Sequence, residues 1–403
     1  SDRGDAGSRE RTALRNLLIA SEVALSIVLV VGAVLLARSL MRLETVDPGF
    51  APDRSIAFTI ALPGGRYPDV DKRFAAFNEI EQRLRQQRGV KAAGASSTIA
   101  LRGTTWSGDA TIEGRAPSDY ERELQHASVT PGYFAASGGR LLAGRFLDEH
   151  DTRDKPPVAL VNETLARQYF RGQPAVGKRI TFGRPTDTSA WREIVGVVAD
   201  EKQEGIDAPV KPEAYTPIAQ QMQNPMTFVV RSSLDAESAI AMAREQVHGV
   251  DKDLALTDVT TLADLKDDSL TPERFRTTLL STFATVALAL AALGIYGVLA
   301  YFVTARRREL GIRLALGARP AEVFGLVVRQ GMRPVLAGAA IGTAAALALT
   351  RLAQSLIFGI DALDPVNYVV ALAVLGSIAL VACALPALRA TRVDPLHALR
   401  NAD

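Results

Sequence analysis

The sequence predicts a membrane α-helical fold with four transmembrane helices and a large α+β domain inserted between the first and second of them. Apolar residues make up 48% of the 403 residues, and they concentrate near the two ends of the chain. Four apolar windows approach or exceed the ~20 residues that a helix needs to cross about 30 Å of hydrocarbon. The long stretch between the first two windows carries strand and helix periodicities instead.

These windows divide the chain into nine segments. The third span is the shortest, since about 17 residues separate Arg333 from Arg351, although both arginine side chains could extend to opposite interfaces. The expected order is an N-terminal tail (1–16), helix 1 (17–38), an exterior domain (39–276), helix 2 (277–304), a hinge (305–333), helix 3 (334–353), a short loop (354–365), helix 4 (366–388) and a C-terminal tail (389–403).

The arginines predict which side each segment faces, because cationic short loops are retained in the cytoplasm while long domains translocate regardless of charge. Arginines precede span 1, lie between spans 2 and 3, and follow span 4: Arg9, Arg11, Arg15; Arg306, Arg307, Arg308, Arg313, Arg319, Arg329, Arg333; Arg389, Arg392, Arg400. We therefore expect a multi-pass protein of the bacterial inner membrane with both termini and the hinge in the cytoplasm. The domain at 39–276 and the loop at 354–365 would then face the periplasm.

The exterior domain has mixed α/β patterns. One strand-helix-strand unit is predicted at 55–62, 70–88 and 90–99, and a second at 226–231, 234–247 and 254–259. The region between them is richer in short strands and turns, with one helix at 163–170. We expect a split α/β part, at about 43–124 and 225–272, that carries an inserted β-rich subdomain at about 125–224.

No catalytic or metal-binding pattern assembles in the sequence. Residues 172–178 match a phosphate-binding loop, but Arg179 stands where Ser or Thr should hold magnesium, so a surface turn is the better interpretation. The histidines have no ligand-like spacing, and Cys383 is the single cysteine. We expect no cofactor, no metal, no enzyme activity and no nucleic-acid partner, and we interpret the scattered exterior carboxylates as solvated surface.

Small and polar residues within the spans have modest interpretations. Glycines leave one side of span 2 and of span 3 without side chains, which favours close packing between helices of the chain over a specific dimer interface. They are Gly294, Gly297, Gly338 and Gly342. Glu22 lies about two turns from Arg15. It is either a hydrated carboxylate near the membrane interface, which its position favours, or part of a proton or substrate relay.

The hinge at 305–333 is the most informative segment. Residues 306–316 are expected to extend span 2, with Glu309 and Arg313 paired across one helical turn and Gly317 ending the helix. Pro320 suits the first turn of the next helix, whose apolar face would be Phe324, Val327 and Val328. Physical reasoning leaves a membrane-side anchor and a partner-docking element equally supported.

A family resemblance favours the docking interpretation. Residues 301–318, Tyr-Phe-Val-Thr-Ala-Arg-Arg-Arg-Glu-Leu-Gly-Ile-Arg-Leu-Ala-Leu-Gly-Ala, resemble the signature of the MacB/FtsX-like permeases, the membrane subunits of mechanotransmitting ABC transporters. Matches along the rest of the chain support the resemblance, at 46–50, 129–134, 142–145, 161–163, 176–179, 194–198 and 393–400.

The resemblance implies a set of partners. It implies docking on a cytoplasmic ABC ATPase dimer, which would hold the ATP and Mg²⁺, through Arg308, Glu309, Gly311, Ile312, Arg313, Leu314, Gly317 and Ala318. It also implies a second permease unit, contact with membrane lipid and, in some members, a periplasmic adaptor. The outcome would be efflux, lipoprotein extraction or regulation, driven through a split porter-like domain.

The start of the chain adds one expectation. The sequence begins with Ser1 and a polar tail rather than Met, and 14–50 resembles the second four-span unit of tandem permeases, so we expect a piece of a longer protein. The alternative function is a membrane-anchored sensor whose exterior domain binds a ligand. A secondary transporter is disfavoured because inverted repeats and broken midplane helices are not apparent.

Overall fold

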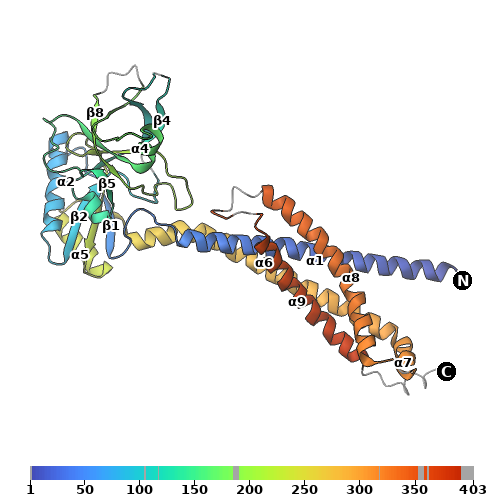
Figure 1. The fold of residues 1–403 in the computed structure, drawn as a ribbon. Helices are drawn as coiled ribbons and strands as arrows, with labels where there is room; N and C mark the ends of the chain where they lie inside the picture. Colours follow the sequence, from blue (N-terminus) through green and yellow to red (C-terminus); the bar gives the residue numbers. More distant parts are fainter. Residues whose placement is uncertain are drawn as a thin grey trace. The chain divides into compact units, whose positions relative to one another are not determined.

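The computed structural model describes residues 2–103, 106–116, 118–184, 190–316, 318–352, 358–360 and 363–391, apart from the side chains of 2–12, 308, 314 and 315. The chain divides into two compact units, which are treated separately below (Figure 1). The helical unit comprises Ser1–Thr45 and Pro272–Asp403. The α+β domain comprises Val46–Thr271.

Four helices of the structure are long and apolar enough to cross a membrane, which confirms the predicted fold class. They are α1 (Asp2–Glu44), α6 (Leu262–Ala305), α8 (Pro320–Leu352) and α9 (Pro365–Ala390). Each predicted span lies inside one of them, except for residue 353 of the third span, which is outside the described residues. The helices exceed the windows because helical structure continues into the polar sequence at their ends, as in α8, which begins at Pro320 rather than at Pro334.

A short helix, α7 (Arg307–Ala315), lies between α6 and α8. We expected 306–316 to continue span 2 as one helix, but α6 ends at Ala305 and a turn at Arg306 separates it from α7. Helical backbone hydrogen bonds nevertheless continue across the turn, since Arg306 N donates to Phe302 O and Leu310 N donates to Arg306 O. The turn makes α7 a distinct element joined closely to α6.

One part of the α+β domain, formed by its two sequence ends, consists of two β-α-β units. They are β1 (Ser55–Ile60), α2 (Val70–Arg85) and β2 (Val90–Ser96), and then β10 (Met226–Ser232), α5 (Ala236–His248) and β11 (Thr257–Thr261). The strand order β11-β1-β10-β2, with antiparallel neighbours, is that of a ferredoxin-like α+β fold. Asp69 and Asp235 cap the helices by accepting hydrogen bonds from Lys72 N and Ser238 N.

Strand alternation positions the core of this part. Ile56, Phe58 and Ile60 of β1 face α2 and α5, which cover one side of the sheet (Figure 1). Ala57 of β1 faces the other side and packs toward α3 (Tyr133–Ser137). The two predicted β-α-β units are therefore present.

The remaining strands form a closed ring of pairings. They are β3 (Ser107–Ile112), β4 (Glu121–Val129), β6 (Val158–Asn162), β7 (Arg179–Phe182), β8 (Arg192–Val198) and β9 (Glu213–Pro217). The order β4-β3-β7-β8-β6-β9 closes because β9 also pairs with β4, in parallel. β5 (Leu141–Gly144) pairs with β8, and α4 (Glu163–Tyr169) follows β6.

The strand pairing corrects one expected boundary. We placed the start of the inserted β-rich region near residue 125, yet β3 pairs with β4 and β7 and so belongs to the ring. The ring is joined to β2 of the ferredoxin-like sheet through a short pairing with β4, at Ser96 and Val129, and by the hydrogen bond from Thr130 N to Ala95 O. The insertion therefore begins between β2 and β3.

Candidate functional site

Helix α7 has one buried face and one exposed face. Leu310 is 2% exposed and belongs to the apolar core of the helical unit, and Gly311 is also buried. Ile312 and Leu316 lie on the outside, with exposures of 39% and 83%. Because Ile312 and Leu316 are four residues apart, and Leu316 N donates to Ile312 O, they lie on one side of this turn. Two apolar side chains are thus presented outward together.

Charged groups flank these apolar residues. Arg313 Nη2 lies 2.7 Å from Glu309 Oε1, and Arg306 Nη1 lies 3.7 Å from Glu309 Oε2. All three side chains are about half exposed. An exposed pair of this kind stabilises a helix by only about 0.3–0.5 kcal/mol, so the charges contribute little to the fold. They remain available to a partner surface.

The start of α8 is occupied by the chain itself. Val323 and Val327 are buried in the core of the helical unit, and Phe324 and Val328 pack against that core. Arg319 N donates to Glu322 Oε2, which caps the helix start. The apolar face that we considered for a membrane anchor or a docking surface is therefore used internally, and the exposed apolar side chains near the turn come from α7.

The predicted docking residues fall into three groups. Glu309, Ile312 and Arg313 are exposed on α7, and Ala318 is half-buried, with its N–H donating to Arg313 O. Gly311 is buried, so its position is not on the exposed face. The side chains of Arg308 and Leu314, together with Gly317, lie outside the described residues.

Glycines allow close approach between helices of the helical unit. A Cβ at Gly338 would lie 2.5 Å from Ala20 O, and one at Gly342 would lie 2.7 Å from Ala24 O, so both positions of α8 pack against the α1 backbone. A Cβ at Gly294 would lie 2.5 Å from Glu22 Oε2. Gly297, which we expected to pack in the same way, has no atom within 4 Å of that position in the described structure.

Four carboxylates among the described residues of the α+β domain are buried, against our interpretation of such groups as solvated surface: Glu81, Asp151, Glu201 and Glu213. Glu201 accepts a hydrogen bond from Tyr133 Oη at 3.0 Å, and Glu213 accepts one from Tyr215 Oη at 2.7 Å. Burial raises the pKa of Glu201 to about 7 and that of Glu213 to about 8. Glu81 forms an ion pair with Arg85 of the same helix, and burial still raises its pKa to about 6.

These buried acids have structural partners rather than a reacting geometry. Tyr133 belongs to α3 and Glu201 follows β8, so their pair joins the ferredoxin-like part to the ring of strands, whereas Glu213 and Tyr215 both lie in β9, two residues apart. Sequence reasoning missed the Tyr133 and Glu201 pair because it depends on packing between two segments that are 68 residues apart. The one sequence signal for a buried acid was Glu213, which begins the short strand β9.

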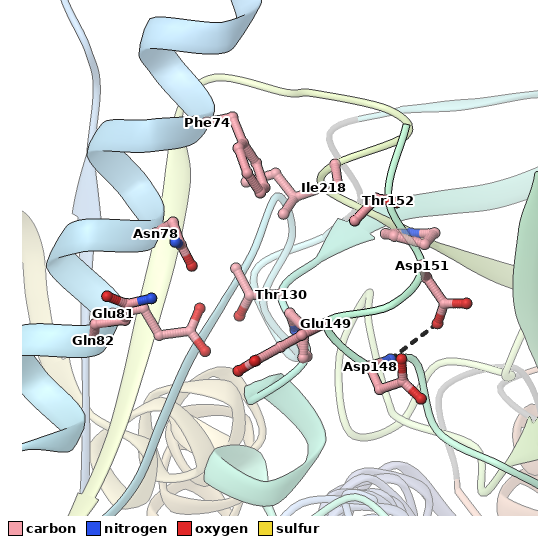
Figure 2. A pocket seen from close by; sticks show the side chains of 13 residues that line it. Phe74, Asn78, Glu81, Gln82, Thr130, Asp148, Glu149, Asp151, Thr152 and Ile218 are labelled. Carbon is pink, nitrogen blue, oxygen red and sulfur yellow. Dashed lines mark hydrogen bonds between the residues drawn. The ribbon is translucent and has the colours of Figure 1, made fainter. Parts of the chain in front are cut away.

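A cavity of about 250 Å³ lies beside Glu81 in the α+β domain. Figure 2 shows Phe74, Asn78 and Glu81 of α2 on one side of it, facing Thr130, Glu149 and Asp151. The carboxylates are engaged by arginines, since Arg85 contacts Glu81 and Glu149 while Arg145 holds Asp151 at 2.7 Å. The cavity therefore offers no free charged group to a ligand.

The described residues of the rest of the domain form no arrangement that suggests catalysis. Within the described residues, no group of three or more His, Cys, Asp or Glu could hold a metal ion. Residues 172–178, which resemble a phosphate-binding loop, lead into strand β7 rather than into a helix, and Arg179 pairs with Glu113. Among the described residues, helix α7 and the residue after it combine exposed apolar side chains with a half-exposed ion pair, which makes them the candidate site.

Two family models match the chain. One, described as a MacB-like periplasmic core domain, covers residues 23–250, and one described as an FtsX-like permease C-terminal region covers residues 281–395. Together they span both units of the structure. The first match alone covers more than half of the chain.

Curated relatives include proteins named macrolide export ATP-binding/permease protein MacB. The one from Agrobacterium fabrum is 27% identical over 290 residues, which are 68% of this chain and 43% of the relative. The one from Neisseria gonorrhoeae is 24% identical over 286 residues, 66% of this chain and 42% of the relative. The chain thus spans less than half the length of the curated relatives it matches.

Similar solved structures cover the α+β region. The periplasmic region of MacB from Actinobacillus actinomycetemcomitans is 16% identical, with a TM-score of 0.37, and the match covers 55% of this chain and 94% of that one. The extracellular domain of the ABC-type transporter YknZ from Gram-positive bacteria is 16% identical, with a TM-score of 0.33, over 50% of this chain and 100% of that one.

Proposed function

Because the chain belongs to the family of FtsX-like permeases with a MacB-like periplasmic core domain, we propose that it couples ATP hydrolysis in the cytoplasm to conformational work in the periplasm. In this proposal α7 docks on a cytoplasmic ABC ATPase dimer, which binds ATP and Mg²⁺. The relatives' names join ATP binding and permease, so the ATPase could belong to the same polypeptide or to a separate subunit.

The exposed face of α7 is the observation that carries the proposal. Ile312 and Leu316 are apolar and exposed, and Glu309 and Arg313 flank them. A small apolar centre with a charged rim is the usual anatomy of a specific docking surface. The same charges add little to stability, so their place on the outside is better explained by recognition than by folding.

Helix α6 supplies a path for the motion. Its 44 residues correspond to about 66 Å of helix, and Leu262 and Leu265 at its first turn belong to the core of the α+β domain. At its other end the hydrogen-bonded turn at Arg306 joins it to α7, whose Leu310 packs in the helical core. A displacement of α7 would therefore act on α6 directly.

The proposal assigns a side of the membrane to each part. The arginines at the start of α1, around α7 and at the end of α9 favour cytoplasmic termini and a periplasmic α+β domain. The ATPase must also bind α7 differently in its two nucleotide states, because tight binding alone moves nothing. A second permease unit, as a second copy or a tandem unit, would supply the second docking site for the ATPase dimer, and a periplasmic adaptor could receive the motion.

Charge reversal tests the proposal. The full chain should co-purify with an ATP-binding subunit or domain from membranes, and its presence should stimulate ATP turnover. Arg313→Glu should reduce that stimulation at least tenfold, since a partner surface complementary to Arg313 would meet a like charge. Arg88→Glu, at an exposed arginine of the α+β domain, is the matched control and should leave stimulation unchanged.

A swapped pair separates recognition from helix stability. Glu309→Arg combined with Arg313→Glu keeps an ion pair on α7 but reverses its direction. We expect stimulation of ATP turnover to stay low in this double variant, because the partner surface would be complementary to each charge at its original position. Normal stimulation by Arg313→Glu, or full recovery in the swapped variant, would count against docking through this face.

A further inference from the structure

A cavity of about 520 Å³ opens in the helical unit among α1, α6 and α8. The polar residues that line it lie just before apolar stretches of the sequence. Arg15 and Asn16 precede the apolar residues of α1, and Gln330 and Arg333 precede those of α8. Its walls are apolar and include Ile295 and Leu299 of α6. One cavity therefore combines two cations with a hydrocarbon-lined interior.

We call this cavity the groove. Its two arginines, Arg15 and Arg333, have no carboxylate partner among the described residues. The guanidinium of Arg15 lies 5.4 Å from the centroid of the Tyr301 ring, and its Nε is buried without a hydrogen-bond acceptor. Arg333 is exposed. Two other arginines of the helical unit are engaged, since Arg313 pairs with Glu309 and Arg389 donates to Tyr296 Oη.

The rim of the groove is open to the membrane. Leu17 and Ile341, which line it, are among the exposed apolar side chains of the helical unit. Tyrosines and arginines gather at the level where a bilayer changes from hydrocarbon to headgroups, and Arg15, Tyr301 and Arg333 all lie at the boundary of an apolar span. The groove therefore begins at headgroup level and continues beside hydrocarbon.

We infer that this groove binds an anionic phospholipid of the surrounding bilayer, with its phosphate between Arg15 and Arg333 and an acyl chain along Ile295 and Leu299. Guanidinium groups donate paired hydrogen bonds to phosphate oxygens, and a buried Nε without an acceptor is a donor that such a phosphate could satisfy. Basic pockets between transmembrane helices select anionic headgroups in the same way.

Charge argues against a second copy of the chain as the occupant. A two-fold interface would bring this surface against itself and would place Arg15 and Arg333 of each copy near the same residues of the other. Like charges in that position repel one another. A lipid phosphate neutralises both arginines, so the lipid is the occupant that the observations favour.

Native mass spectrometry of the full chain, purified with equal amounts of phosphatidylglycerol and phosphatidylethanolamine, tests this inference. The wild-type chain should retain phosphatidylglycerol preferentially. Each cation near a membrane surface contributes about fivefold or slightly less, so Arg15→Gln with Arg333→Gln should lower this retention by about 10–30-fold. Arg329→Gln is the matched control, because Arg329 lies one turn earlier in α8 and does not line the groove.

Two further variants keep the test decisive if the double glutamine variant fails to fold. Arg15→Lys with Arg333→Lys keeps the charge and should keep most of the lipid, whereas Ala337→Phe fills the groove and should release it while both arginines remain. Equal retention of the two lipids by the wild type, or an equal loss in Arg329→Gln, would overturn the inference. So would displacement by inorganic phosphate, or a change of oligomeric state without a change in lipid retention.

Discussion

Charged side chains have opposite surroundings in α7 and in the α+β domain. On α7, Glu309 and Arg313 form a pair that is half exposed on both sides. In the α+β domain, Glu81, Glu201 and Glu213 are almost completely buried and are held by arginine or tyrosine partners. Buried charges are expensive to leave unpaired, while exposed pairs contribute little. Substitutions should therefore separate the two regions: stability should change in the domain and coupling should change on α7.

The largest change in stability is expected from Arg85→Met. This substitution removes the partner of buried Glu81, and an uncompensated buried charge should destabilise the domain by about 3 kcal/mol, or roughly 6–12 °C in unfolding temperature. Tryptophan fluorescence of the full chain can follow this, because both tryptophans, Trp106 and Trp191, lie in the α+β domain.

The same helix provides the control for Arg85→Met. Arg83 pairs with Glu79 at 2.9 Å, also across one turn of α2, but both of these side chains are exposed. Arg83→Met should change the free energy of unfolding by less than about 0.5 kcal/mol. Equal effects of the two substitutions would contradict the contrast between buried and exposed pairs.

The pH dependence of stability is the next largest effect. The pKa of Glu201 is raised to about 7 and that of Glu213 to about 8 in the folded domain, so the folded state binds protons that the unfolded state has already lost. Their contribution is complete below about pH 4.5 and is lost as the pH rises through about 7 and 8. Burial lowers the pKa of His126 to about 3, which opposes this gain below about pH 6.5.

The domain should therefore be more stable at about pH 6.5 than at about pH 8.5, by on the order of 2 kcal/mol. Thermal unfolding of the full chain, followed by tryptophan fluorescence at the two pH values, measures the difference. Glu213→Gln should shrink it, because that group no longer titrates. A domain that is more stable at the higher pH would show that these acids are ionised in the fold.

An effect of comparable size is expected from Gly338→Ala in the helical unit. The added Cβ would lie 2.5 Å from Ala20 O, so α1 and α8 must move apart at a cost of about 1–3 kcal/mol. Gly297→Ala is the control, since no atom lies within 4 Å of its Cβ position, and alanine favours a helix. Circular dichroism during heating should separate the two variants, and equal stability would mean that this glycine contact is not close in solution.

The smallest effect on stability is expected from Arg313→Gln on α7. It removes a half-exposed ion pair, so the free energy of unfolding should fall by less than about 0.5 kcal/mol. Stimulation of ATP turnover should nevertheless fall severalfold. Measuring both quantities on one preparation sharpens the comparison, because a stability loss as large as that of Arg85→Met would assign the pair a role in folding.

Several elements were predictable because their signals are local. The four spans follow from apolar runs, and α2 and α5 follow from helical spacing after Asp69 and Asp235, which cap them as N-terminal aspartates do. Strand β3 was missed, since Ser107–Ile112 contains Gly108 and Asp109 and shows little alternation. Its place is decided by pairing with β4 and β7.

Features that depend on distant residues were not predictable from spacing. The Tyr133 and Glu201 contact and the groove of Arg15 and Arg333 both join segments that packing alone brings together. On α7 the sequence suggested the ion pair of Glu309 and Arg313, but the burial of Gly311 and the exposure of Leu316 could be seen only in the structure. Whether these exposed residues bind an ATPase is the question that the structure raises most directly.

Photo-crosslinking at two leucines of equal exposure answers that question. Leu316, beside α7, and Leu352, at the opposite end of α8, are both 83% exposed. With a photo-crosslinking amino acid at each position in turn, the account predicts that position 316 captures the ATP-binding partner, in a yield that changes with nucleotide, and that position 352 does not. Failure to capture it at 316, or equal capture at both positions, would contradict the assignment of α7 as the coupling site.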